Sequence, residues 1–266
     1  MSGLYNTALN ITALKAEIKQ SAGENLTELF YLPSCQSTNT ECMNVGSHGS
    51  VVLAEKQTAG RGRRGNNWHS PDSQNIYCSI GINKTIAAEY LGLMSLVVGI
   101  CIVESLQSLG VDDASLKWPN DILLQGKKLG GVLIETKALS QDEFYLAIGF
   151  GLNINLTQQE CDGIGQPAIS LNQLHEVNFT RHQLLVALVS NILQQSMLFE
   201  VDSIDHLIEQ FNRFDSFRGK QVIVKTRTEE IAGVTLGLER TGWLKVQTEQ
   251  GVQSFSAAEI SLRQRV

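Results

Sequence analysis

Residues 116–135 read LKWPNDILLQGKKLGGVLIE, and this stretch decides the fold. Two apolar runs, Ile122–Leu124 and Val132–Glu135, flank the dipeptide Gln125-Gly126. Short apolar runs on either side of a glycine-containing turn predict a β-hairpin. We expect this hairpin to belong to a largely antiparallel or mixed sheet.

Further strands and helices are predicted on both sides of the hairpin. Strand composition marks Ser50–Glu55, Asn75–Ile82 and Phe144–Phe150. A short first helix ends at Gly23, and Ser37-Thr38-Asn39 offers N-caps for a second. Longer helices are expected over Ala87–Leu109, over Thr180–Phe199 with a capping box at Thr180 and Gln183, and over Ser203–Phe214. Helices beside such a sheet give an α+β fold, which we expect to occupy residues 1–216.

The pattern changes from about Phe217 onward. Val222 and Val224 alternate with polar residues, and turn signals at Thr241-Gly242 and Gln250-Gly251 flank a short apolar run. Short strands separated by turns predict a compact β-barrel. We therefore expect a second, smaller domain over residues 217–266.

Composition and charge exclude several classes of function. The 266 residues include 21 Lys+Arg against 27 Asp+Glu, a formal charge of −6, which argues against nucleic acid or an anionic membrane as the partner. The five cysteines form no CxxC pair, so neither a disulfide framework nor a cysteine zinc site is indicated. The N-terminus has no signal-peptide pattern, and the longest apolar stretch, Leu91–Val103, is too short to span a bilayer. A cytoplasmic protein is expected.

Residues 60–68, GRGRRGNNW, form a segment that we call the Gly/Arg loop. Glycines let backbone N–H groups turn toward a ligand, and arginines supply forked donors that match phosphate and carboxylate oxygens. A solvated surface loop of the same composition is the alternative. Because the rest of the chain is acidic and Trp68 follows directly, we favour a local anion site.

Three other segments have unusual content. Lys117–Asp121 combines a cation, an indole, a proline and two polar side chains. Lys127–Gly131 places two lysines before a glycine pair, and Gly149–Asn153 places glycines at the end of a strand. Taken singly, they fit a turn, solubilising charges and β-bulges. Taken together with the Gly/Arg loop, they predict a pocket that holds a phosphate against a flat apolar group.

These segments, in this order and approximate spacing, resemble the biotin–protein ligases. The similarity runs from about residue 30 to the terminus and includes Ser37-Thr38-Asn39 upstream and Glu259–Arg263 near the end. The resemblance implies the biotin/lipoate ligase catalytic fold, which is like that of class II aminoacyl-tRNA synthetases. It also implies that the C-terminal barrel is SH3-like.

The resemblance implies a reaction in two steps. Biotin and ATP would give biotinyl-5′-AMP and diphosphate, and a lysine of a biotin carboxyl carrier protein domain, as in acetyl-CoA carboxylase, would then take the biotin. The first step brings two anions together, so Mg²⁺ and positive side chains would be needed to offset their repulsion. No nucleic-acid or membrane partner is expected, and a homodimer is left open.

The resemblance also implies roles for individual residues. Lys128, Arg63 and Arg61 would be catalytic, because their charge would lie where carboxylate meets phosphate. The biotin site would comprise Ser37, Thr38, Asn39, Gln57, Gly60, Arg61, Arg63, Lys128, Gly131, Leu133, Gly149 and Gly151. The nucleotide site would comprise Arg63, Trp68, Lys128, Asn153 and Arg263. Asp121 would hold Mg²⁺, directly or through water.

Two departures from the family pattern stand out. Asn66 replaces an arginine that is common in the family, which removes one phosphate donor. About 36 residues precede Ser37, too few for the winged helix-turn-helix of bifunctional members, so a monofunctional ligase is expected.

Two alternatives remain at this point. A lipoate–protein ligase would share the fold and the adenylation chemistry, but its substrate has an apolar dithiolane head, whereas Ser37-Thr38-Asn39 and Gln57 are polar. A biotin- or nucleotide-sensing regulator would not need the full set of Arg61, Arg63, Lys128 and Asp121. Both considerations favour a biotin ligase.

Overall fold

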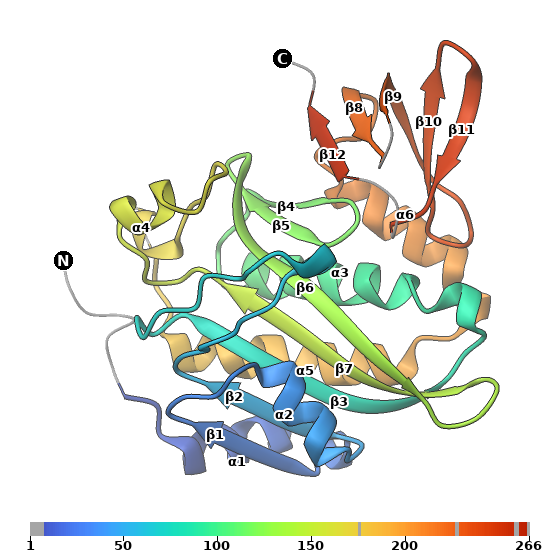
Figure 1. The fold of residues 1–266 in the computed structure, drawn as a ribbon. Coiled ribbons are helices and arrows are strands. Elements are labelled where there is room, and N and C mark those ends of the chain that lie inside the picture. Colours follow the sequence, from blue (N-terminus) through green and yellow to red (C-terminus); the bar gives the residue numbers. More distant parts are fainter. Residues whose placement is uncertain (1–7, 175–176, 227–228, 258–260, 265–266) are drawn as a thin grey trace.

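The larger part of the molecule is built on a seven-stranded sheet (Figure 1). The computed structural model describes residues 8–174, 177–226 and 229–257, and the backbone of 261–264. The strand order is β1-β2-β3-β7-β6-β5-β4. The strands are β1 (Glu28–Leu32), β2 (Ser50–Ala54), β3 (Ile76–Thr85), β4 (Ala114–Lys117), β5 (Asp121–Leu124), β6 (Lys127–Ala138) and β7 (Glu143–Leu152). β1 and β2 are parallel and the other neighbours antiparallel, which confirms the predicted mixed sheet.

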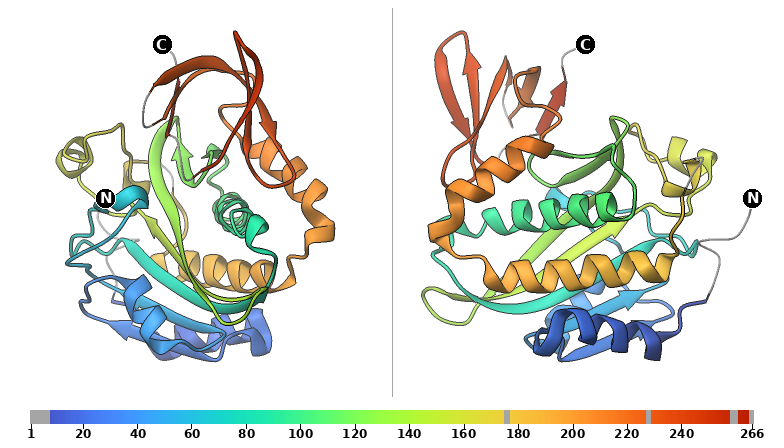
Figure 2. Two further views of the ribbon diagram at one scale, coloured as in Figure 1. Left: turned by 45° about the vertical axis from the view of Figure 1, so that its right-hand side comes forward. Right: turned by 180° about the vertical axis from the view of Figure 1, so that it is seen from behind.

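The helices cover the two faces of this sheet unequally (Figure 2). α1 (Ile11–Ala22), α3 (Leu93–Ser108) and α5 (Arg181–Leu198) pack together on one face, and α6 (Ile204–Phe214) packs against α3 and β4. α2 (Thr38–Val45) lies on the opposite face, against β2, β3 and β7. The short elements are α4 (Gln158–Asp162) and the 3₁₀ helices η1 (Gly23–Asn25), η2 (Arg63–Gly65), η3 (Ala88–Tyr90), η4 (Leu171–Gln173) and η5 (Val201–Ser203). On the face that carries α2, much of β6 and β7 is therefore covered by loops and not by helices.

The apolar helix α3 is the centre of the core. Its buried residues include Val97, Ile100 and Val103, and it contacts α5, α6 and three strands. The helical segment Ala88–Ser108 extends beyond the apolar stretch Leu91–Val103 on both sides, and by length and composition alone it would be long enough to cross a bilayer. Most of the segment is buried inside the fold, as in the core helix of a globular domain.

Local signals in the sequence set most of the element boundaries. Gln125 and Gly126 both have positive φ, as a two-residue hairpin turn between β5 and β6 requires. The pairing of β5 with β6 shifts opposite Leu129, so a bulge accompanies the glycine pair. Thr180 forms the predicted capping box with Gln183.

Two details differ from the sequence-based expectations. The helix expected from Ala87 begins at Leu93, because the 3₁₀ turn η3 precedes it. Ser37 occupies the N-cap position of α2, but its side chain makes no capping bond. The carboxamide oxygen of Gln57 accepts from the Thr38 backbone N–H instead, at 2.8 Å. Tertiary contact thus replaces the local cap.

The C-terminal part forms a separate five-stranded antiparallel sheet, in the order β11-β10-β9-β8-β12. Its strands are β8 (Gln221–Lys225), β9 (Glu230–Leu238), β10 (Leu244–Thr248), β11 (Gly251–Phe255) and β12 (Ser261–Gln264). This sheet is consistent with the expected SH3-like barrel. Trp118 joins the two parts, since its indole N–H donates to the Gly242 carbonyl at 3.0 Å. The exact boundary between residues 216 and 217 stays a prediction.

Candidate active site

A cavity of about 1170 Å³ lies on the α2 face of the seven-stranded sheet. Its floor is formed by the face of β6 and β7 that carries Gly131, Leu133, Gly149 and Gly151. The Gly/Arg loop, the segment 117–121 and the segment 159–168 complete its walls. The structure therefore brings together, in one cavity, the segments that the sequence singled out separately.

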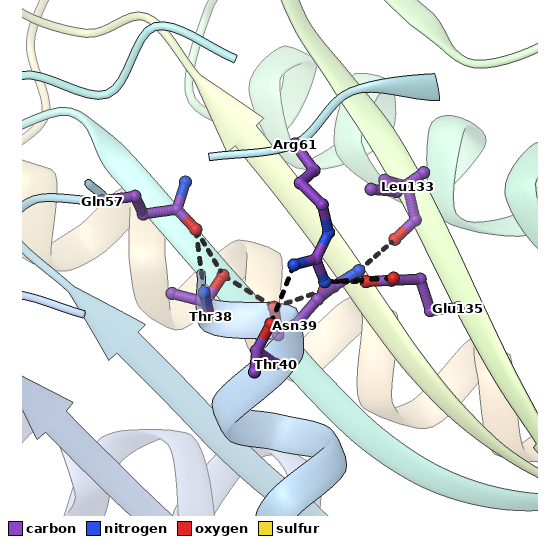
Figure 3. Close-up of polar contacts among 8 residues, drawn as sticks. Thr38, Asn39, Thr40, Gln57, Arg61, Leu133 and Glu135 are labelled. Atoms are coloured by element: carbon purple, nitrogen blue, oxygen red, sulfur yellow. Dashed lines mark hydrogen bonds and ion pairs between the residues drawn. The ribbon is translucent and has the colours of Figure 1, made fainter. Parts of the chain in front are cut away.

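One end of the cavity is lined by neutral polar groups, of which Thr38 and Asn39 are buried and Gln57 is half-buried (Figure 3). Gln57 accepts from the backbone N–H of Thr38 and donates to Ser70 Oγ at 2.9 Å. The Asn39 amide donates to the Leu133 carbonyl at 3.1 Å, and its oxygen accepts from Ser79 Oγ at 2.6 Å. These bonds fix the polar side chains in single orientations, and Ser37 is buried beside them. Such an end suits a neutral, polar ligand group.

The glycines of β7 are needed because other side chains lie directly on the strand. A methyl group on Gly149 would come within 2.2 Å of Asn39 Oδ1. One on Gly151 would come within 2.6 Å of Trp68 Nε1 and 2.7 Å of its Cε2. These two positions therefore carry Asn39 and the Trp68 indole against the cavity floor.

Lys128 and Asp121, which both line the cavity, form an ion pair. Lys128 Nζ lies 2.6 Å from Asp121 Oδ1, and both side chains are 17% exposed. The same ammonium lies 5.6 Å from the centroid of the Trp68 ring. Gly131 pairs with Asp121 across the strands, and a methyl group there would lie 3.7 Å from Lys128 Cε. The cation is thus held over the floor, next to an indole face.

Arg63 is the arginine of the Gly/Arg loop that turns toward this ion pair. Its guanidinium donates to Asn120 Oδ1 at 3.2 Å and to the Ala257 carbonyl of the C-terminal part. Burial lowers the pKa of Arg63, and neighbouring Arg64 lowers it further, while Asp121 opposes the shift. An arginine stays charged despite such a shift, so Arg63 and Lys128 concentrate positive charge in the cavity.

Trp68 and Asn153, which the resemblance assigned to the adenosine, have different surroundings. The Trp68 indole N–H is buried and has no hydrogen-bond partner among the described residues. Buried donors without partners are uncommon, and they call for a functional or structural reason. Asn153 is 3% exposed and donates to the Ile169 carbonyl at 3.3 Å. Its amide is therefore partly engaged within the protein, although it still lines the cavity.

Two predicted site residues are not placed in the cavity lining. Gly60 lies at the base of the Gly/Arg loop, where a methyl group would meet Ser70 Oγ and the Trp68 carbonyl at 2.6 Å. Arg263 lies on β12, where its backbone pairs with Ile223, and its side chain is outside the described part. All the other predicted residues line the cavity, Arg61 and Asp121 included.

Residues 159–168 form a further wall of the cavity, which the sequence alone did not indicate. This segment pairs with β6, since the Lys128 N–H donates to the Pro167 carbonyl at 2.9 Å and Ile169 donates back to Lys128. Thr157 and Glu160 form a capping box, a spacing that would have revealed the short helix α4. Nothing local in the sequence shows that this segment reaches Lys128.

Comparison with known proteins places this geometry in a family. Residues 31–153 match the model of the biotin/lipoate A/B protein ligase family, and residues 217–263 match the model of the biotin protein ligase C-terminal domain. The bifunctional ligase/repressor BirA of Escherichia coli K12 is 33% identical over 237 residues, which cover 87% of this chain and 73% of BirA.

Solved structures agree with this match. A biotin protein ligase from Aquifex aeolicus in complex with biotin and ATP superimposes with a TM-score of 0.76 at 28% identity, covering 90% of this chain and all of that one. A biotin protein ligase from Leishmania major in complex with biotinyl-5-AMP gives a TM-score of 0.57 at 26% identity, covering 86% of this chain and 99% of that one.

Proposed function

This chain belongs to the biotin protein ligase family, and we propose from that premise that it activates biotin with ATP and transfers it to protein. The products of the first step are biotinyl-5′-AMP and diphosphate. In the second step the biotinyl group passes to a lysine of an acceptor protein. The observation that carries the assignment of the site is the Lys128–Asp121 ion pair beneath the Gly/Arg loop, with Trp68 and Arg63 beside it.

The cavity offers a different environment to each part of the two substrates. The polar end, with Thr38, Asn39 and Gln57, suits the ureido head of biotin, which is neutral and makes hydrogen bonds. Gly131 and Leu133 leave room for an apolar chain along the floor. The Trp68 indole suits the flat face of adenine, since aromatic rings stack favourably. The two reacting groups then meet beside Lys128.

In the first step a biotin carboxylate oxygen attacks the α-phosphorus of ATP, and the bond to diphosphate breaks. Both reactants are anions, so their approach is opposed by charge repulsion. In the proposed complex Lys128 and Arg63 lower this repulsion and stabilise the charge that develops on the phosphoryl oxygens. Asp121 keeps the ammonium over the floor before the substrates enter. Orientation of the two substrates in one cavity supplies the remaining acceleration.

Magnesium would enter with ATP rather than occupy a site made only of protein ligands. Among the described residues no group of three or more His, Cys, Asp or Glu side chains is arranged to hold a metal ion. Asp121 is one carboxylate beside the reaction centre, and Mg²⁺ is commonly held by one or two carboxylates together with phosphate oxygens. Asp121 therefore fits such an ion, which would neutralise charge on the phosphates.

The acceptor would be the lysine of a biotin carboxyl carrier domain, for example in an acetyl-CoA carboxylase subunit. The amine attacks the acyl carbon of biotinyl-5′-AMP, an amide forms, and AMP leaves. A cytoplasmic location would place the enzyme with that acceptor. The homodimer remains a prediction.

The function is tested by incubating the protein with ATP and Mg²⁺ and with either biotin or lipoate, then measuring the mass of the acyl-adenylate. We expect biotinyl-adenylate. Lipoyl-adenylate without biotinyl-adenylate would identify a lipoate ligase, and binding of biotin without an adenylate would identify a sensor.

The role of Lys128 is tested by Lys128→Ala, with the exposed neighbour Lys127→Ala as the matched control. Loss of a group that stabilises developing charge lowers the rate about 100-fold or more, whereas the control should keep the wild-type rate. Adenylate formation in a single turnover is the readout. Formation at the wild-type rate by Lys128→Ala would refute the role given to this lysine.

A further inference from the structure

The side chain of Arg61 points toward Glu135 and Thr40 and is hydrogen-bonded to both (Figure 3). Its Nη2 donates to both carboxylate oxygens of Glu135, at 3.0 and 2.7 Å. Its Nη1 donates to Thr40 Oγ1 at 2.9 Å. One arginine of the Gly/Arg loop is therefore bound to two elements outside the loop, strand β6 and helix α2.

Both anchor points continue directly from the polar end of the cavity. Side chains alternate along a strand, so Glu135 shares a face of β6 with Gly131 and Leu133, which line the cavity. Thr40 follows Asn39, whose amide donates to the Leu133 carbonyl. The Arg61 bonds therefore fasten the loop to the same two walls that form the polar end.

We propose that Glu135 is a positioning residue that holds the Gly/Arg loop over the cavity through Arg61. This inference rests on the proposed function, because the loop would protect the biotinyl-adenylate from water. Two arginines that lie two positions apart in the loop therefore have different roles. Arg63 supplies charge beside Lys128, whereas Arg61 fixes the loop against β6 and α2.

The Arg61–Glu135 ion pair is partly exposed, which suits a loop that must both close over the cavity and open again. The Arg61 side chain is 41% exposed and that of Glu135 is 35% exposed. Exposed ion pairs are weak and are weakened further by salt. A bond of this strength would bias the loop toward the closed position without trapping substrates or products. Within the loop the Trp68 N–H donates to the Gly60 carbonyl at 2.9 Å, and Arg63 holds the loop separately to Asn120 and Ala257.

The first test uses hydrogen–deuterium exchange of the ligand-free protein and Glu135→Gln. We expect the Gly62, Asn66 and Trp68 amides, which are bonded within the loop, to exchange about 2- to 5-fold faster in the variant, the range of an exposed ion pair. Glu143→Gln, on the neighbouring strand β7, is the control and should match the wild type. At about 1 M salt, where charges are screened beyond about 3 Å, the wild type should approach Glu135→Gln.

The second test measures release of biotinyl-adenylate from the enzyme after it has formed from biotin and ATP. Glu135→Gln should form it at the wild-type rate but release it severalfold faster, at an unchanged melting temperature. Replacing a residue with a merely structural role would lower the melting temperature and would not speed up release relative to formation. If the wild type forms no adenylate, the proposed function fails. If it forms adenylate and Glu135→Gln matches it in both exchange and release, the role of Glu135 is overturned.

Discussion

At the scale of single residues, the site depends on two close approaches to strand β7. Asn39 lies on Gly149 and the Trp68 indole lies on Gly151, each closer than any side chain at those positions would permit. The sequence-based interpretation of these glycines as points of close backbone approach is thus physically explained. Their partners come from α2 and from the Gly/Arg loop, so two separate segments pack against one strand.

Gly151→Ala should impair the nucleotide side of the site more than the biotin side. The added methyl group would displace the indole by steric overlap, and overpacking of this kind costs about 1–3 kcal/mol. We expect the KM for ATP to rise about tenfold or more, with a smaller change in the KM for biotin. Gly92→Ala is the control, since a methyl group there meets no atom within 4 Å. An equal rise in both KM values would count against the assignment of Trp68 to adenine.

At the scale of elements, a buried polar network connects the end of β2, the start of α5 and the start of β3. Arg181 is 1% exposed and donates to Glu55 Oε1 and to the Asn75 carbonyl, both at 2.8 Å. Tyr31 donates to the same Glu55 oxygen at 2.7 Å. The Asn75 side chain in turn accepts from the Ile154 N–H at 2.7 Å. This network supports the chain that runs on from Asn153.

Arg181→Met should therefore destabilise the fold strongly. Removing one partner of a buried ion pair leaves an unpaired charge and typically costs about 3–5 kcal/mol. The exposed pair Arg240–Asp205 gives the matched control, because Arg240→Met should cost about 1 kcal/mol or less. Urea unfolding measures both values. A similar small loss in the two variants would contradict the structural importance of the network.

Most elements could be predicted from the sequence because their signals are local. The hairpin turn at Gln125-Gly126 and the capping box at Thr180 are formed by residues close together in the chain. The polar contacts of the site could not be predicted in this way. Glu135 meets Arg61 across 74 positions, and Arg63 meets Ala257 across 194. The family resemblance identified candidate residues, but these partners emerge only from the folded arrangement.

At the scale of the whole molecule, the C-terminal sheet contacts the walls of the cavity. Trp118 donates to Gly242, and Arg63 of the Gly/Arg loop donates to Ala257. The connection between the two parts passes through Asp215, which bridges to Leu116 and accepts from the Phe217 N–H at 2.9 Å. The C-terminal part therefore contacts residues that line the cavity directly.

Asp215 should make stability depend on pH. Burial raises the pKa of Asp215 to about 6, although its bond from Phe217 opposes the shift. A raised carboxyl pKa means that the folded state binds the proton more tightly than the unfolded state does. This contribution is complete below about pH 4, the pKa of an exposed aspartate, and is lost as the pH rises through about 6.

Asp215→Asn should therefore stabilise the protein at pH 7.5, by about 1–3 kcal/mol, and have little effect at pH 4. An asparagine keeps the acceptor for Phe217 and removes the charge. The exposed Asp113→Asn is the control and should change stability little at either pH. Thermal unfolding at the two pH values gives the comparison. A gain of equal size at pH 4 and pH 7.5 would show that charge is not the cause.

The central claim is that the Gly/Arg loop and the Lys128–Asp121 pair enclose an acyl-adenylate. A crystal structure of the protein with biotin, ATP and Mg²⁺ tests this claim most directly. We predict biotinyl-5′-AMP with its acyl–phosphate junction at Lys128 and Arg63, its adenine against Trp68, and Arg61 still bound to Glu135. A nucleotide bound outside this cavity, or a junction remote from Lys128, would contradict the claim.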